Sequence, residues 1–466
     1  MKKLCCVFLI ALWLTGCQSV SYSPGAEGIG DPYYPQLGNG GYDALHYTLE
    51  LSIDPKNNTL SGDCTIEAQA TQPLSAFNLD FSGLTIEKVA INGKAAKYRR
   101  EEGELTITPA RPIDNGDVFT VTTTYNGTPK RTLSLGMLWP SGWFHNDDNE
   151  VFVSSEISSS DNWYPVNDHP LDKASYSFRI TVPKPYVVAA NGLLQEEVDN
   201  GDTVTYVWEA AEPMASYTAA VSIDEYVIET EQGPDGILIR NYLPVDFPET
   251  SKVNIHQTAD MLAFFGERFG PYPFDAYGIV IVDFPRETPF FTLAMETQTL
   301  SQHGEEEDAL SEYIIAHELA HQWFGDSVSL KNWQDIWLKE GAATYAEWLW
   351  LEHKEGRDAL DAKVRRVYPM EAFSPNPPGN PLSTNLYTST IFDRGAMTFH
   401  ALRLRVGDEV FFQILRTYTE RYRYGNASTA EFIAVAEEVS EQDLTEFFDA
   451  WLYARNIPAI PEMGLD

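Results

Sequence analysis

The 466-residue sequence contains little cysteine. Its four cysteines stand at positions 5, 6, 17 and 64, so three of them lie within the first 17 residues. A disulfide framework is therefore excluded for the body of the chain. Cys64 lies in a strand-like run, where we expect a small buried side chain and not a reactive thiol.

Positive charge is also scarce. The chain has 32 Lys and Arg residues against 68 Asp and Glu residues, which gives a formal net charge of −36. Because phosphate groups attract surplus positive charge, we expect no nucleic acid partner. A hydrophobic content of 43% is that of a folded chain, and the length is sufficient for more than one domain.

A short apolar segment stands at the N-terminus, between two lysines and the sequence L14-T-G-C17. This is the form of an export signal, and it is too short to span a membrane. The ending resembles a bacterial lipoprotein cleavage site; the alternative is an ordinary signal peptide with a chance cysteine. We predict a lipoprotein signal peptide over 1–16, an acylated Cys17 and a tether over 17–30. The lipid would anchor the protein in the cell envelope, at the outer membrane if the host is Gram-negative.

The rest of the chain changes character near residue 233. Up to that point apolar and polar residues alternate, as over 46–53 and 175–182, which is typical of half-buried strands. Helical periods appear afterwards, as over 395–404. The pattern therefore predicts an α+β multidomain chain, with a β domain over 31–233 and a catalytic domain over 234–466.

The second half contains the motif H317-E-L-A-H321. In a helix, two histidines four residues apart lie on one face and can reach one metal ion. Glu340 follows His321 after eighteen residues and opens a second apolar segment, which could pack against the first as a helix. Two imidazoles and one carboxylate suit Zn²⁺ and leave a fourth position for water. We predict one Zn²⁺ per chain on His317, His321 and Glu340.

Glu318, next to the first histidine, is placed to act as general base on zinc-bound water. Such a motif could also be a solvated polar stripe, but Ile315, Leu319 and Trp323 make the helix mostly apolar. Thr344, four residues after Glu340, would lie on the same face of the second helix. It would either hydrogen-bond a metal ligand or pack between helices, and the sequence favours neither.

Several runs resemble the membrane-alanyl-aminopeptidase family of zinc peptidases, and the match covers nearly the whole mature chain. They are D31-P-Y-Y-P-Q-L-G-N-G-G-Y-D-A-L-H-Y47, W163-Y-P-V-N-D-H-P-L-D-K173, A190-N-G192, H317-E-L-A-H-Q-W-F-G-D326 and W337-L-K-E-G-A-A-T-Y345. The resemblance implies a saddle-like N-terminal antiparallel β domain and a thermolysin-like zinc catalytic domain. Many members add a helical C-terminal domain, for which we expect no room in this chain.

This family recognises the free N-terminus of a peptide with the run G-x-M-E-N. The matching run is L293-A-M-E-T297, so the resemblance assigns Ala294, Met295 and Glu296 to substrate binding, with the glycine and the asparagine replaced. A second acidic or amide residue of the family lies nine positions before the proline of its W-[FY]-P motif, and here it is Glu156. Two carboxylates can hold one α-ammonium group, which implies removal of single N-terminal residues.

One position departs from the family pattern in a way that bears on the rate of peptide hydrolysis. In the family a tyrosine before a [DEKR]-[KR]-G-A run donates a hydrogen bond to the tetrahedral intermediate, and here Phe392 occupies that position. Loss of one such donor typically costs about 10²–10³ in kcat. Tyr387, five residues earlier, is a candidate substitute.

Two functions are therefore compatible with the sequence. The first is a zinc aminopeptidase that hydrolyses the N-terminal peptide bond of peptides with a free N-terminus. The alternative is a catalytically impaired, zinc-containing peptide-binding lipoprotein of the cell envelope, which Phe392 favours and the retained Glu318 opposes.

Overall fold

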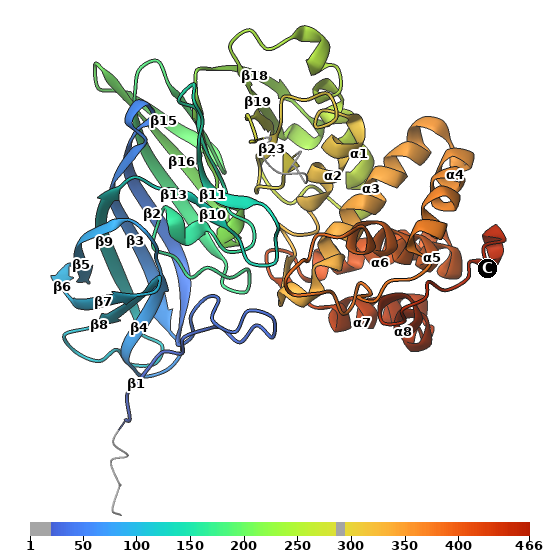
Figure 1. Cartoon of the computed structure of the whole chain (residues 1–466), viewed down its shortest axis with the longest axis horizontal. Coiled ribbons are helices and arrows are strands. Elements are labelled where there is room, and N and C mark those ends of the chain that lie inside the picture. The colour runs from blue at the N-terminus through green and yellow to red at the C-terminus, as the bar shows by residue number, and fades with distance from the viewer. Residues whose placement is uncertain (1–19, 286–293) are drawn as a thin grey trace, which may run out of the picture.

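The computed structural model describes residues 20–285 and 294–466, which form two parts lying side by side (Figure 1). The first part is built of strands, and the second is mostly helical. The predicted α+β class with two parts is therefore confirmed. The predicted signal peptide and Cys17 lie outside the described residues. No helix within the described ranges has the length and apolarity needed to cross a membrane.

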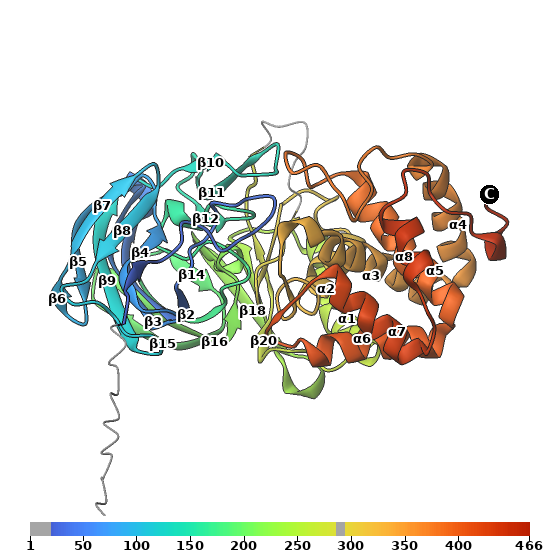
Figure 2. The ribbon, with the colours of Figure 1, turned by 90° about the horizontal axis from the view of Figure 1, so that it is seen from below.

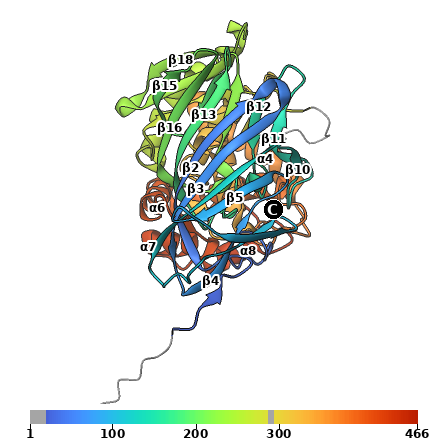
Figure 3. The same ribbon diagram turned by 90° about the vertical axis from the view of Figure 1, so that its left-hand side faces the viewer.

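The broadest sheet of the first part has eight strands, and Figure 3 shows its face. Apolar and polar residues alternate along its strands, so that one face of the sheet is buried. In β2, Tyr47, Leu49 and Leu51 are buried, while Glu50 between the two leucines is exposed. Neighbouring strands run antiparallel except β2 and β13, which pair in parallel. In spatial order the strands are β15 (Leu193–Asp199), β16 (Thr203–Met214), β13 (Ala174–Pro183), β2 (Tyr42–Asp54), β3 (Thr59–Ala70), β9 (Val118–Gly127), β5 (Thr85–Ile91) and β6 (Lys94–Ala95).

Two smaller sheets complete the first part. One contains β1 (Ser23–Pro24), β4 (Leu74–Asp80), β8 (Glu104–Thr108) and β7 (Lys97–Glu101). The other contains β10 (Arg131–Leu133), β11 (Pro140–His145), β12 (Val151–Ser154), β17 (Val221–Asp224) and β14 (Val187–Ala190). The buried core is rich in aromatic rings, and Tyr47 stacks on Tyr176 at 4.7 Å between ring centroids. Cys64 is buried, as predicted.

The second part begins with a mixed sheet. Its strands are β18 (Tyr226–Gln232), β19 (Leu238–Pro244), β20 (Ala276–Tyr277), β21 (Ile279–Ile281), β23 (Ser301–His303) and β22 (Ala294–Met295). The proposed domain boundary between residues 233 and 234 falls in the turn that joins β18 to β19. Those two strands pair with each other in one sheet, so the structure shows no separation between domains at this point. The boundary therefore stays a prediction.

Eight α-helices of the described chain follow or flank that sheet. They are α1 (Thr258–Phe269), α2 (Glu312–His321), α3 (Trp337–Glu355), α4 (Arg357–Val367), α5 (Gly395–Val406), α6 (Asp408–Arg421), α7 (Thr429–Ser440) and α8 (Thr445–Leu452). A two-stranded sheet, β24 (Ser329–Leu330) with β25 (Asn426–Ala427), fastens the segment between α2 and α3 to the start of α7. The helical segment predicted over 395–404 is thus confirmed as α5.

Local sequence explains how the two helices of the motif are fixed. The Ser311 hydroxyl caps α2 by accepting a hydrogen bond from the Ile314 amide. Gly341 in α3 faces Gly395 at the start of α5, and a Cβ on Gly341 would lie only 2.9 Å from the Gly395 backbone. The close helix crossing therefore requires glycine at both positions. It brings the π-helical turn η9 (Thr390–Arg394), which contains Phe392, against α3.

The two parts are joined by hydrogen bonds, and Figure 2 shows the junction from below. The ammonium of Lys173 donates to the carbonyl oxygens of Asp326 (2.7 Å) and Ser327 (3.0 Å). The Asn191 side chain donates to the Gln298 carbonyl oxygen at 2.7 Å. Lys173 and Asn191 belong to two of the sequence runs that resemble the family. These runs thus hold the strand-rich part against the segments that follow Glu296 and His321.

Candidate metal centre and adjoining cavity

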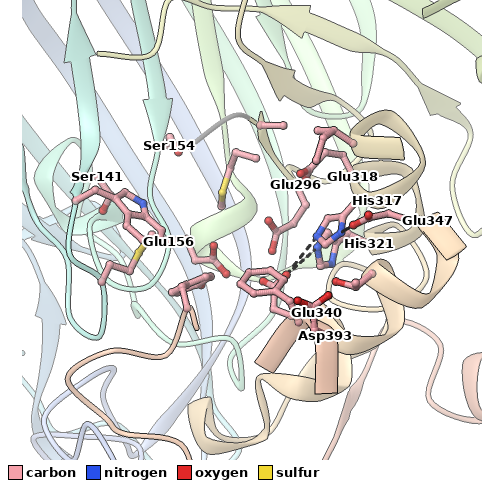
Figure 4. Close-up of a pocket in the computed structure, with 18 of the residues that line it drawn as sticks. Ser141, Ser154, Glu156, Glu296, His317, Glu318, His321, Glu340, Glu347 and Asp393 are labelled. Carbon is pink, nitrogen blue, oxygen red and sulfur yellow. Dashed lines mark hydrogen bonds and ion pairs between the residues drawn. The ribbon is translucent and has the colours of Figure 1, made fainter. Parts of the chain in front are cut away.

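A cavity of about 540 Å³ opens at the junction of the two parts (Figure 4). The first part lines it with Met137, Trp139, Ser141, Ser154 and Glu156. The second part adds Ala294, Met295, Glu296, Ile314, His317, Glu318, His321, Glu340, Thr344, Glu347, Lys363, Tyr387, Phe392 and Asp393. Every candidate site residue from the sequence analysis therefore lines this one cavity, except Cys17, which lies outside the described residues.

The three predicted metal ligands come together on two helices. His317 and His321 lie one turn apart on α2, and Glu340 lies in the first turn of α3. The Nε2 atoms of the two histidines lie 3.3 Å and 3.5 Å from the same oxygen, Oε2 of Glu340. All three side chains are buried, and one ligand atom from each lies within 4.8 Å of the others. This donor set, two imidazoles and one carboxylate, fits a zinc ion.

Both imidazoles are oriented by hydrogen bonds on the side away from Glu340. Nδ1 of His317 lies 2.7 Å from Oε1 of Glu347, and Nδ1 of His321 lies 2.9 Å from the Phe324 carbonyl oxygen. Such partners fix the ring orientation and leave Nε2 for a metal. Sequence reasoning missed Glu347, although it follows Glu340 by seven residues and so lies on the same face of α3.

Glu318 and Thr344 both have polar atoms available at this centre. Oε2 of Glu318 and Oγ1 of Thr344 are buried and have no hydrogen-bond partner among the described residues. Burial raises the pKa of the Glu318 carboxyl well above its ordinary value, against the opposing effect of His317. A buried polar atom without a partner is costly, so these atoms mark a place where a bound group would complete the site. No hydrogen bond joins Thr344 to Glu340 in the structure, so its role stays open.

Glu340 remains ionised in this environment. Burial acts to raise the pKa of its carboxyl, but Lys339 and then His321 lower it more, so the pKa lies well below its ordinary value. An ionised carboxylate is the form that binds a metal.

Glu156 and Glu296 reach the cavity from different parts of the chain and meet there. Glu156 follows β12 in the strand-rich part, and Glu296 follows β22 in the second part. Figure 4 shows Glu156 on the side of the strands, away from the helices that carry the histidines. One oxygen of each lies 2.5 Å from the ammonium of Lys339, a side chain that sequence reasoning did not single out. Burial lowers the pKa of Lys339, but Glu156 and its neighbouring carboxylates raise it well above the ordinary value.

The segment that carries Glu296 is tied directly to the metal motif. Gln322, next to His321, accepts a hydrogen bond from the Thr299 amide at 2.8 Å and donates to the Thr297 carbonyl oxygen at 3.2 Å. Ala294 and Met295 form β22 and line the cavity. The preceding Leu293 lies outside the described residues.

Phe392 lies beside the metal centre. Its ring centroid is 6.1 Å from that of His317 and 6.3 Å from that of Tyr387. The hydroxyl of Tyr387 is buried and has no hydrogen-bond partner among the described residues. Burial, and then the charge of Glu156, raise the pKa of Tyr387 well above its ordinary value, so the hydroxyl keeps its proton.

Comparison with known proteins agrees with this geometry. The model of the peptidase M1 N-terminal domain matches residues 43–218, and that of the peptidase family M1 domain matches residues 253–451. The chain belongs to peptidase family M1. Similar structures include the M1 zinc metallopeptidase of Deinococcus radiodurans, with 30% identity, a TM-score of 0.85, and coverage of 93% of this chain and 98% of that one. A mutant of that peptidase, bound to a Tyr-Ser-Ala substrate, is equally similar, with a TM-score of 0.85.

Curated relatives are longer. Aminopeptidase M1 of Arabidopsis thaliana is 26% identical over 444 residues, which cover 89% of this chain and 50% of the relative. Human glutamyl aminopeptidase is 26% identical over 466 residues, covering 90% and 47% respectively. The chain thus spans about half the length of the curated relatives that it matches. Zinc is the cofactor of the family, and the buried donor set described above fits it.

The contact between His317 and Glu347 leads to a first prediction. Replacing Glu347 with Gln keeps the shape of the side chain but removes the charge that orients the imidazole. We expect zinc affinity to fall about 10- to 100-fold, as measured by competition with a chromophoric chelator. The matched control is Glu355→Gln, an exposed glutamate at the end of the same helix. Equal zinc affinity in the two variants would show that Glu347 does not support the metal centre.

Proposed function

We propose that this protein is a zinc aminopeptidase that removes single residues from the free N-terminus of peptides. The observation that carries the proposal is the meeting of two carboxylates, Glu156 and Glu296, with a three-ligand metal centre in one cavity. Two carboxylates at this place can bind the α-ammonium group of a free N-terminus. The names of the aminopeptidase relatives and the Tyr-Ser-Ala complex of the similar peptidase support the same activity.

In this proposal each group of side chains in the cavity has a separate role in binding or catalysis. Glu156 and Glu296 bind the α-ammonium group of the substrate, so that the first peptide bond lies at the metal centre. Ala294 and Met295 line the cavity next to them and contact the substrate. His317, His321 and Glu340 hold the zinc ion, which when bound supplies a Lewis acid for water and for the scissile carbonyl group. Glu318 accepts the proton of the attacking water and passes it to the leaving amine.

This division of roles predicts a specific pattern of activity. The native chain should release amino acids from unblocked peptides, and not from the same peptides carrying an N-acetyl group, which cannot form the ammonium contact. Chelation of zinc should abolish release, and Glu318→Gln should lower kcat about 10²- to 10⁴-fold while zinc content is retained. Equal cleavage of blocked and unblocked peptides would contradict an aminopeptidase and indicate an endopeptidase.

A second candidate function rests on Phe392. Its ring lies beside His317 and has no hydroxyl to donate to a tetrahedral intermediate. A chain with this defect would be an impaired, zinc-containing protein that binds peptides without turning them over. The buried hydroxyl of Tyr387 opposes this candidate. It keeps its proton, lines the same cavity and has no partner of its own among the described residues, so it is available as a substitute donor.

Two substitutions decide between these candidates. If Tyr387 is the donor, Tyr387→Phe should lower kcat about 10²- to 10³-fold on aminoacyl anilides, and Phe392→Tyr should change it little. If the chain is impaired instead, the native rate should be very low and Phe392→Tyr should raise it strongly. The zinc content of each variant controls for loss of the metal. A native rate that is high and unchanged in Tyr387→Phe would exclude Tyr387 as the donor.

We also propose that the protein is a lipoprotein of the cell envelope, anchored through Cys17. The proposal rests on the apolar segment that ends at L14-T-G-C17 and on the tether-like residues that follow it.

The anchor is tested by expressing the full chain in a bacterial host with labelled palmitate. We expect the native chain to carry label and to enter the membrane fraction, and Cys17→Ala to lose both properties. Cys64→Ala is the matched control and should keep them, because Cys64 is buried in the strand-rich part. A native chain that takes up no label would contradict the anchor.

A further inference from the structure

The Lys339 side chain contacts three of the five glutamates that line the cavity just described, namely Glu156, Glu296 and Glu340. Its ammonium contacts Glu156 and Glu296 at 2.5 Å each and also pairs with Oε1 of Glu340. The three carboxylates have one oxygen each within 4.8 Å of the others, so the ammonium joins them as a common centre. Glu340 meanwhile offers its other oxygen, Oε2, to the two histidines.

The position of Lys339 is set by the fold. It stands in the first turn of α3, immediately before Glu340, and its side chain is fully buried. The three glutamates line the cavity, whereas Lys339 is not among the described residues that do, so it supports the cavity from behind. The rings of Tyr217 and Tyr387 lie 5.9 Å and 5.8 Å from its ammonium, a distance at which aromatic faces attract a cation.

We propose that Lys339 is a positioning residue for substrate recognition: an internal ammonium that holds Glu156 and Glu296 and ties them to the metal ligand Glu340. It thereby fixes how far the anchor for the peptide N-terminus lies from the metal centre. This inference rests on the proposed aminopeptidase function, because it assumes that the two glutamates bind an α-ammonium group.

The charges support this role. Three carboxylates so close together in a buried place repel one another, and the ammonium of Lys339 lowers that repulsion. Glu340 is also a ligand of the metal centre, so Glu156 and Glu296 carry two negative charges against the one positive charge of Lys339. This surplus is negative, so a second ammonium, that of the substrate, is still attracted. Oε1 of Glu156 and Oε1 of Glu296 face Lys339, and both carboxylates line the cavity. In this proposal their second oxygens bind the ammonium group of the substrate.

A buried lysine can also serve stability alone, and the chain contains a control for that case. Lys173 is half-buried at the junction of the two parts and donates to two backbone carbonyl oxygens, and it is not among the described residues that line the cavity. If Lys339 were only structural, Lys339→Met and Lys173→Met would both lower the melting temperature and leave KM unchanged. KM does not depend on the fraction of protein that is active, so partial unfolding does not change it.

The experiment compares the native chain, Lys339→Met and Lys173→Met on unblocked aminoacyl anilides, with zinc content and melting temperature measured for each. We expect Lys339→Met to raise KM at least tenfold and Lys173→Met to leave KM within twofold of native. A native chain that cleaves unblocked substrates while Lys339→Met keeps the native KM would overturn this inference alone. A native chain that does not cleave them would overturn the proposed function instead.

Chemical rescue separates the ammonium from the volume it fills. In Lys339→Ala the missing atoms correspond to n-propylammonium, so that ion should lower KM toward the native value, whereas 1-propanol of similar size should not. The native chain at the same amine concentration corrects for competition with substrate. Equal rescue by propanol would show that only volume matters and would overturn the proposal.

A test without any variant covers the case in which the substitutions prevent folding. In a crystal structure of the zinc-loaded native chain, the Lys339 ammonium should lie within hydrogen-bond distance, about 3.5 Å, of Glu156, Glu296 and Glu340. An ammonium that has left Glu156 and Glu296 when zinc is bound would contradict the proposal.

Discussion

The packing of α2 against α3 is the contact on which the whole site depends. The first helix brings the two histidines and Glu318, and the second brings Glu340, Glu347 and Lys339. A shift of α3 by one turn would separate Glu340 from both imidazoles and Lys339 from the glutamates. The paired glycines Gly341 and Gly395 fix α3 against α5, and through η9 they also fix Phe392. One well-packed helix therefore positions the metal ligand Glu340, the Glu347 carboxylate that orients His317, and the Lys339 charge behind the cavity.

The strand-rich part contributes to the chemistry as well as to the shape. It supplies Glu156, and its side chains form one wall of the cavity. A buried hydrogen bond from the Asn191 side chain to the Gln298 carbonyl oxygen holds it against the segment that follows Glu296. Because Glu156 and Glu296 meet only across this junction, the anchor for a peptide N-terminus exists only when both parts are in place.

The sequence predicted those parts of the site that depend on local spacing. Two histidines four residues apart must share a face of a helix, and alternation along residues 46–53 must place one face of a strand in the core. Glu156 and Glu296 lie far apart in the chain, so no local pattern joins them, and only the resemblance to a family did. The parallel pairing of β2 with β13 could not be predicted, because it is set by contacts between distant segments.

The contacts of two residues, Glu347 and Lys339, could not be predicted from the sequence. Glu347 had a usable signal, its seven-residue distance from Glu340, yet only the structure shows that it meets His317. Lys339 stands beside Glu340 in the sequence, where a charged residue in the first turn of a helix would ordinarily be exposed to solvent. Its burial follows from the three carboxylates around it, two of which arrive from other parts of the chain.

The most direct test of the account is a crystal structure of the zinc-loaded Glu318→Ala chain with an unblocked tripeptide, with the metal located by anomalous scattering at the zinc edge. The account predicts zinc on His317, His321 and Glu340, the peptide nitrogen between Glu156 and Glu296, and the first peptide bond at the metal. A peptide whose N-terminus runs past the two glutamates, or zinc bound among Glu156, Glu296 and Glu340, would contradict it.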